Sequence, residues 1–275
     1  MFSLASEFIG RAFPPFFWGT LIISALGCCM GFHEFVWFMS VGYGFSVMCI
    51  GAFLLVMGLI NGVLTPALTV MCILFMIYGY RLGGYLLKRE LKNANYKKTL
   101  SSTGSDKKLP IPVSAFMWVY ASFEYLFQTS SVTYRMVNHA SDNLFAWIGV
   151  IIMACAILGE ATADKQKSAA KAINPKRFCD TGLFKIVRCP NYFSEIMFWV
   201  GTTVSGIGTI SGNQWIIPIA ALILIVYIMY NSAQRLELRH EKNYGLDPEY
   251  QHYSDTVPLL FPFTTQYHSM KVYRD

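Results

Sequence analysis

The chain has 275 residues, of which 54% are hydrophobic and only 14% are charged. Its mean hydropathy of +0.41 exceeds what a soluble domain of this length needs for one core, so we expect an integral membrane protein in contact with lipids and without a nucleic-acid partner. The seven cysteines form no Cys-x-x-Cys pair and the five histidines lack ligand spacing, so we expect neither a disulfide framework nor a metal site.

A helix that crosses a hydrocarbon layer of about 30 Å needs about 20 predominantly apolar residues. Seven stretches meet or approach this requirement, and the first is the weakest because it opens with two prolines. These stretches are about 14–32, 35–60, 64–87, 110–132, 143–161, 190–210 and 213–234. The sequence therefore predicts an all-α fold, a polytopic membrane bundle of about seven transmembrane helices that forms a single domain over residues 1–275.

The connections between these stretches differ strongly in charge. Those at about 88–108 and 160–189 are rich in lysine and arginine, whereas 61–63 and 211–213 carry almost no charge. The positive-inside rule places the two basic connections and the C-terminal tail in the cytosol, with the N-terminus on the opposite, lumenal side. Topology and anionic lipid headgroups account for most of these lysines without any ligand.

A compact group of polar residues precedes and opens the sixth apolar stretch. Pro190 suits the first turn of a helix, because its φ matches and its missing N–H would be unpaired there. The first amides of that helix, at Asn191 and Tyr192, then lie beside the guanidinium of Arg188 and form a cradle for a phosphate. Glu195 falls on the same helix face as Asn191 and Tyr192.

Two further polar groups lie inside apolar stretches, where charged side chains are costly and often functional. Tyr78, Arg81 and Tyr85 recur at helical spacing on one face. Glu124 and Gln128 are four residues apart, so they stack on one face, where the carboxyl group could donate a proton or a hydrogen bond. Snorkelling of Arg81 to the interface and a structural contact between helices are the alternative interpretations.

The run from Gly182 to Glu195 resembles the pattern Gly-Leu-(Phe/Trp)-x-x-x-Arg-His-Pro-Asn-Tyr-(Phe/Leu)-Gly-Glu of steroid 5α-reductase-like membrane proteins. It departs from that pattern at Cys189, where His is commoner, and at Ser194, where Gly is commoner. The series Tyr78-x-x-Arg81-x-x-x-Tyr85 is similar to one in the third span of these enzymes.

Two weaker similarities extend the resemblance to about residues 78–262. Residues 160–167 resemble the family's Glu-x-x-Ala-Asp-x-Gln-Lys, and His240-Glu241 with Tyr253 and Pro262 resembles its closing element. The Gln-Glu pair that steroid enzymes carry in their second span has no acidic counterpart in residues 36–60. Either Glu124 and Gln128 replace that pair, or the substrate is not a steroid.

The resemblance implies a membrane reductase that uses NADPH to reduce a conjugated C=C bond of a lipophilic substrate, in the endoplasmic reticulum if the chain is eukaryotic. Tyr78 is the expected donor to the substrate carbonyl, with Glu124 as the rival catalytic residue. The residues that we expect to bind the cofactor lie near the cytosolic ends of the spans. They are Arg81, Glu160, Asp164, Lys171, Arg188, Asn191, Tyr192, Glu195, His240 and Tyr253.

Two alternatives stay open. Membrane methyltransferases of the isoprenylcysteine or phospholipid type, which use S-adenosylmethionine, share an Arg-His-Pro-x-Tyr element and a pair of glutamates after a span. Here Glu237 and Glu241 are four apart rather than adjacent, and Asn191 with Glu195 favours the reductase. The second alternative is a non-enzymatic sterol-binding membrane protein, which Cys189 in place of the family's His keeps open.

Overall fold

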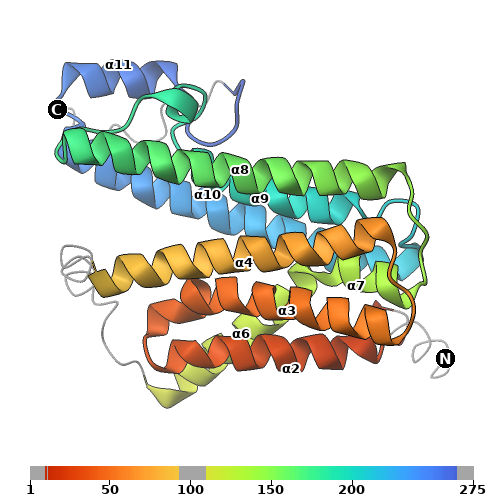
Figure 1. Cartoon of the computed structure of the whole chain (residues 1–275). Helices are drawn as coiled ribbons and strands as arrows, with labels where there is room; N and C mark the ends of the chain where they lie inside the picture. The colour runs from red at the N-terminus through yellow and green to blue at the C-terminus, as the bar shows by residue number, and fades with distance from the viewer. Residues whose placement is uncertain (1–9, 11, 93–109, 265–275) are drawn as a thin grey trace. The chain divides into compact units, whose positions relative to one another are not determined.

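A computed structural model describes Gly10 and residues 12–92 and 110–264 (Figure 1). The described residues form helices joined by short connections, with no strand among them. The α-helices are α2 (Phe16–Cys28), α3 (Val41–Ile60), α4 (Pro66–Lys92), α6 (Ile111–Gln128), α7 (Ser130–Val137), α8 (Leu144–Ile173), α9 (Pro190–Val204), α10 (Ile216–Tyr244) and α11 (Pro248–Thr256). Four 3-10 helices join them: η1 (Cys29–Phe32), η2 (Phe35–Met39), η3 (Gly182–Lys185) and η4 (Gly212–Trp215). The predicted all-α fold is confirmed.

Each of the seven predicted apolar stretches contains a helix, but fewer of them are long and apolar enough to cross a membrane. Within the described part of the chain, four helical segments meet that requirement: Val41–Ile60, Pro66–Lys88, Leu144–Ile173 and Gly212–Tyr244. The segment Phe16–Phe32 is apolar but shorter. Four candidate spans support an integral membrane protein, and the count of seven stays a prediction.

Two helices continue beyond the apolar stretches that the sequence marks. The fifth stretch was expected to end near residue 161, yet α8 continues to Ile173, and α10 continues past the expected 234 to Tyr244. Hydropathy marks where a helix leaves the hydrocarbon layer. The helix itself continues, with its backbone hydrogen bonds, as long as the following residues favour a helix. Residues 160–172 are rich in alanine and lysine, which are strong helix formers. Most of the basic connection at about 88–108 lies outside the described residues.

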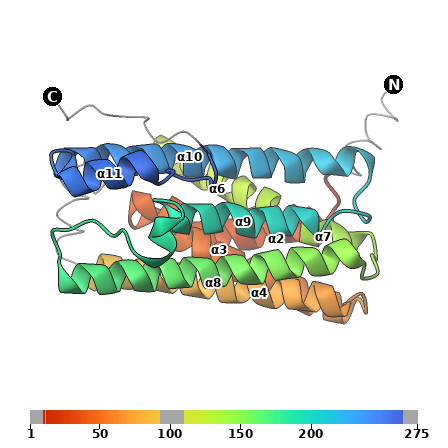
Figure 2. The same ribbon diagram turned by 90° about the horizontal axis from the view of Figure 1, so that it is seen from above.

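The chain divides into two compact units, Met1–Val150 with Thr202–Ala221 and Ile151–Gly201 with Leu222–Asp275. The prediction of a single domain stays a prediction. In the first unit, α3 and α4 lie side by side in both ribbon views (Figures 1 and 2). A Cβ atom on Gly79 would lie 2.2 Å from the carbonyl oxygen of Gly44, and one on Gly44 would lie 2.5 Å from the amide nitrogen of Gly83. Glycines four residues apart thus let the two backbones touch, as in packed membrane helices.

A buried arginine organises the connections of the first unit. Arg135, 1% exposed, donates from Nη1 to the carbonyl oxygen of Ser205 at 2.8 Å and from Nη2 to that of Ser141 at 3.0 Å. Asp142 accepts the backbone N–H of Ala67 at 2.9 Å and so caps the first turn of α4. These contacts fix the ends of α4 and α7 and of the segment after α9.

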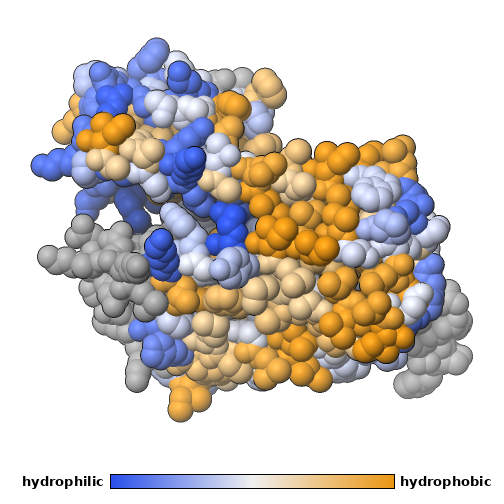
Figure 3. Space-filling model, viewed as in Figure 1, coloured by the Kyte–Doolittle hydropathy of each residue, from blue (hydrophilic) through white to orange (hydrophobic). Residues whose placement is uncertain are grey.

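The second unit contains most of α8, α9 and α10, with η3 and α11. Its core joins the two later helices to the segment after α11 through Cys189, Ile196, Ala233, Leu259 and Leu260. Figure 3 shows hydrophilic residues over α11 and hydrophobic residues over the first part of α8. The candidate site occupies the hydrophilic end of this unit.

Candidate functional site

The segment before α9 is held in place by the tail of the chain. Helix α9 begins at Pro190, which confirms the predicted helix start. The backbone N–H of Arg188 donates to the carbonyl oxygen of Pro258, and that of Cys189 donates to that of Leu259, each at 2.9 Å. The residues at the mouth of α9 are therefore fixed by main-chain contacts with the segment after α11.

A buried ion pair joins this segment to α10. Nη1 of Arg188 donates to Oε1 of Glu237, and the two side chains are 2% and 4% exposed. Glu241, one turn further along α10, is also buried, at 2% exposure. Both glutamates bear on the methyltransferase alternative and Glu241 belongs to the closing element of the resemblance, but neither is among the residues expected to bind the cofactor. Their signal was their spacing: two acidic residues four apart, following an apolar helix.

The acidic residues of α8 lie beside the first turns of α9. Nδ2 of Asn191 donates to Oδ1 of Asp164, so the two residues expected to bind the cofactor are in direct contact. Glu160 lies one turn before Asp164 and is buried at 6% exposure. Glu195 is 5% exposed, and its Oε1 accepts the indole N–H of Trp199 at 2.9 Å. Tyr192 occupies the same first turns of α9 and is half-buried.

Lys171 binds the connection between α8 and η3 through hydrogen bonds. Its ammonium group donates to the carbonyl oxygens of Pro175 and Arg177, at 3.1 and 2.6 Å, and to the hydroxyl of Tyr244 at 3.0 Å. An ammonium group has three hydrogens, so these contacts occupy all of its donors. Its predicted contact with a phosphate stays a prediction, and the structure gives it a role in holding the connection.

His240 and Tyr253 lie in an aromatic cluster formed by Phe178, His240, Tyr244, Tyr250 and Tyr253. The ring of Tyr253 stacks on that of Phe178 with centroids 5.3 Å apart, and its hydroxyl donates to the carbonyl oxygen of Phe184 at 2.8 Å. Burial raises the pKa of the Tyr253 and Tyr250 hydroxyls, so both stay protonated at neutral pH. The cluster fixes α11 and the connection at Phe178 against the end of α10.

The remaining predicted site residues belong to the first unit. Tyr78 is fully buried, and its hydroxyl donates to that of Tyr43 at 2.9 Å. The ring of Tyr43 in turn lies 4.8 Å from that of Tyr125, whose hydroxyl donates to the carbonyl oxygen of Phe38 at 2.6 Å. Arg81 lies on α4, one turn after Tyr78. Tyr43 was not among the predicted site residues, because it stands alone in an apolar stretch and gives no periodic signal.

The predicted stacking of Glu124 and Gln128 is confirmed. Nε2 of Gln128 donates to Oε1 of Glu124 at 3.2 Å, and both side chains are buried in α6. In residues 12–92 and 110–264, no group of three or more histidine, cysteine or acidic side chains could hold a metal ion. The expectation of no metal stays a prediction.

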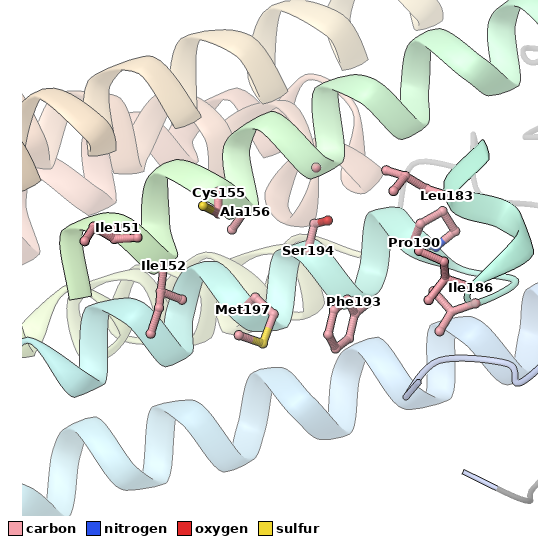
Figure 4. Close-up of a pocket in the computed structure, with 12 residues that line it drawn as sticks. Ile151, Ile152, Cys155, Ala156, Leu183, Ile186, Pro190, Phe193, Ser194 and Met197 are labelled. Carbon is pink, nitrogen blue, oxygen red and sulfur yellow. The ribbon is translucent and has the colours of Figure 1, made fainter. Parts of the chain in front are cut away.

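A pocket of about 340 Å³ lies between α8, η3 and α9 in the second unit (Figure 4). One wall is formed by α8 residues between Ile151 and Gly159, and the facing wall by α9 residues between Pro190 and Met197. Residues of η3 and the segment after it complete the lining. Apart from the Ser194 hydroxyl and the Cys155 thiol, its lining side chains are apolar. No sequence pattern pointed to this pocket, because its two walls are far apart in the chain.

Neither a curated protein nor a solved structure matches the chain. Residues 30–257 match the model of a family described as "Protein of unknown function (DUF1295)". That match covers most of the chain, from η1 through α11. The chain therefore belongs to the DUF1295 family, a family of membrane proteins that includes steroid 5-alpha-reductase-like members.

Proposed function

We propose that the protein is an NADPH-dependent membrane reductase that delivers hydride to a conjugated C=C bond of a lipophilic, steroid-like or enoyl-lipid-like substrate. The observation that carries the proposal is the contact of Asn191 with Asp164 at the start of α9, beside the buried Glu160 and Glu195. All four residues belong to the motifs that resemble the reductases, and the family includes reductase-like members.

These residues suit the polar parts of a nicotinamide nucleotide. Carboxylates accept hydrogen bonds from ribose hydroxyls and from a carboxamide NH₂ group, and Asp164, Glu160 and Glu195 supply such acceptors. Arg188 is neutralised by Glu237, and the donors of Lys171 are bound to the connection. In this proposal, phosphate groups therefore meet the exposed cations at the same ends of α8 and α10, Lys165 and Arg239.

Bound NADPH would supply the hydride, which adds to the β-carbon of the conjugated system. The chain's own task is to stabilise the negative charge that then develops on the carbonyl oxygen. Tyr78 is our candidate for that task, because a buried hydroxyl is a neutral donor that needs no charged group inside the membrane. A phenol has one proton, so when Tyr78 donates to the substrate its hydrogen bond with Tyr43 must reverse, with Tyr43 donating to the Tyr78 oxygen and holding it in position. Glu124, held by Gln128, is the rival donor.

A second candidate is methyl transfer from S-adenosylmethionine. In the described part of the second unit, the buried charged side chains are four carboxylates, those of Glu160, Glu195, Glu237 and Glu241, and one guanidinium, that of Arg188. This excess of buried negative charge suits a sulfonium cation, which carries no phosphate. The reductase stays our first choice because the Asn191 and Glu195 spacing matches its motif.

Thermal unfolding of the purified protein in detergent separates these candidates. A ligand that binds only the folded state, at about 100 times its dissociation constant, stabilises it by about 2.7 kcal/mol. We expect a clear upward shift with NADPH, a smaller one with NADH and none with S-adenosylmethionine. A shift with S-adenosylmethionine alone would transfer the assignment to methyl transfer, and no shift with any of the three would favour a non-enzymatic sterol-binding protein.

Matched asparagine variants locate the site. Asn191→Ala removes the donor to Asp164 and should weaken NADPH binding at least tenfold, roughly the worth of one hydrogen bond to a charged group. Asn174→Ala changes an exposed asparagine after α8 and should leave NADPH affinity unaltered. Equal affinity in both variants would remove Asn191 from the cofactor site.

A further inference from the structure

The pocket between α8 and α9 is elongated. Its α8 wall extends from Ile151 to Gly159, eight residue steps along the helix, which corresponds to about 12 Å at 1.5 Å per residue. The facing wall extends over two turns of α9, from Pro190 to Met197. Figure 4 shows Cys155 and Ser194 between the two helices. The space is therefore a groove that follows two neighbouring helices.

The groove offers almost nothing to a polar or charged ligand. Its polar side chains are the Ser194 hydroxyl and the Cys155 thiol, and Pro190 contributes a wall without a backbone N–H. The position of Ser194 depends on Gly159, because a Cβ atom there would lie 2.8 Å from Ser194 Oγ. Burying a charged group in such surroundings is costly, so the walls select an apolar ligand.

The groove also lies in a part of the chain that meets lipid. Helix α8 is one of the candidate membrane spans. Ile151, at the end of the groove that lies within this span, is 60% exposed, whereas Ile186 at the other end belongs to the connection expected in the cytosol. Since the surroundings of such a helix are hydrocarbon, a molecule that enters from its surface comes from the bilayer.

We propose that this groove binds one hydrocarbon chain of a membrane phospholipid, laid along α8 and α9 with Ser194 beside it. A flexible hydrocarbon chain can follow a groove that extends for about two helical turns along α8 and α9. The inference does not depend on the reductase assignment, since it rests on the walls of the groove and on the membrane span that forms one of them.

Photolabelling tests the proposal. Purified full-length protein in detergent is titrated with a phosphatidylcholine that carries a diazirine at mid-chain, and labelled peptides are mapped by mass spectrometry. We expect saturable labelling within residues 151–159 and 190–197, which excess unlabelled phosphatidylcholine removes. The exposed Ile223 on α10, 65% exposed, should show only weak labelling that does not saturate. Labelling spread evenly over the exposed apolar helices would overturn the proposal.

Filling the groove provides the matched comparison. Ala156→Phe and Cys155→Trp both place an aromatic ring in it, and Cys155 is exposed, so its replacement leaves the packed core unchanged. Each added ring takes the place of several methylene groups of the bound lipid chain, so the probe should bind at least about tenfold more weakly. Leu158→Phe changes a side chain that is 66% exposed and does not line the groove, and labelling should stay at the original level.

The outcomes remain decisive if one variant misfolds. If Ala156→Phe melts at a lower temperature, Cys155→Trp alone decides. Labelling of Cys155→Trp at the original level would overturn the proposal. Displacement of the probe by a sterol, with phosphatidylcholine unable to compete, would also overturn it and assign the groove to a ring system. Loss of labelling together with unchanged NADPH binding would establish the lipid site separately from the cofactor site.

Discussion

The guanidinium of Arg188 and the carboxylate of Glu237 form a buried ion pair between residues 49 positions apart, joining the start of α9 to α10. The same arginine is tied through its backbone N–H to Pro258. One residue of the motif thus connects three segments of the second unit, and its charge is compensated inside the protein.

Removing one member of this pair should strongly destabilise the fold. Glu237→Gln removes the counter-charge that Glu237 supplies to the buried guanidinium of Arg188, and it should lower the free energy of unfolding by about 3–5 kcal/mol. Glu249→Gln breaks an exposed ion pair, in which the side chain of Arg177 is 40% exposed and that of Glu249 is 66% exposed. It should lower the free energy of unfolding by less than about 1 kcal/mol. Denaturant titration in detergent measures both. Equal losses in the two variants would contradict the buried role of Arg188 and Glu237.

Gly182 should be required for the turn before η3. Its φ of 62° lies in the left-handed region, and an added Cβ atom would lie 2.3 Å from the amide of Gln166. That amide accepts the backbone N–H of Leu183 at 2.9 Å and holds η3 to α8. Gly182→Ala should therefore cost more than the strain of the left-handed conformation alone, which is about 1–2 kcal/mol.

Gly62→Ala supplies the control for this effect. Gly62 has a φ of 64°, and a Cβ atom there meets nothing within 4 Å, so its replacement reports backbone strain alone. The melting temperature of Gly182→Ala should be lower than that of Gly62→Ala. If the two variants melt together, the contact with Gln166 does not hold the turn.

The sequence predicted the helices and the local pairs of the site, because both depend on short-range spacing. Pro190 marked the start of α9, and the spacing of Glu124 and Gln128 predicted that they share one face of a helix, where they form a hydrogen bond. Contacts between distant segments left no such pattern. Periodicity does not encode which helices pack together. That packing determines the pairing of Arg188 with Glu237, the hydrogen bond from Tyr78 to Tyr43 and the groove beside Ser194.

The Tyr78 hydroxyl should matter for turnover more than for folding. Tyr78→Phe removes the donor to Tyr43 and should lower turnover about 100-fold or more, as expected for the loss of one donor to a developing oxyanion. NADPH binding should stay near normal, and the free energy of unfolding should fall by no more than about 1.5 kcal/mol. If Glu124→Gln abolishes turnover and Tyr78→Phe does not, the donor is Glu124.

Cys189 should be an unreactive thiol. Burial, followed by the nearby charge of Glu237, raises its pKa from 9.0 to about 12. At pH 8 only about one thiol in ten thousand is then ionised, so alkylation should be far slower than at the exposed Cys29. Peptide mapping after a timed maleimide reaction measures this difference, and equal rates would contradict the burial of Cys189.

The same pKa predicts a pH dependence of stability. The folded state holds the Cys189 proton up to a pH of about 12, whereas the unfolded thiol releases it near 9.0. The contribution of the protonated Cys189 thiol to the stability of the fold is therefore complete below pH 9 and is lost as the pH rises toward 12. Between about pH 9 and 10, before tyrosines ordinarily ionise, Cys189→Ala should show a flatter decline in melting temperature than the unaltered protein.

Isotope transfer tests the central claim most directly. Membranes containing the protein are incubated with NADPH deuterated at the transferred position of nicotinamide C4 or, separately, with S-adenosylmethionine carrying a trideuterated methyl group, and the lipid extract is analysed by mass spectrometry. The reductase assignment predicts a lipid that gains one deuterium from the nucleotide, and its amount should fall with Tyr78→Phe. Incorporation of the trideuterated methyl group, with no deuterium from NADPH, would contradict that assignment.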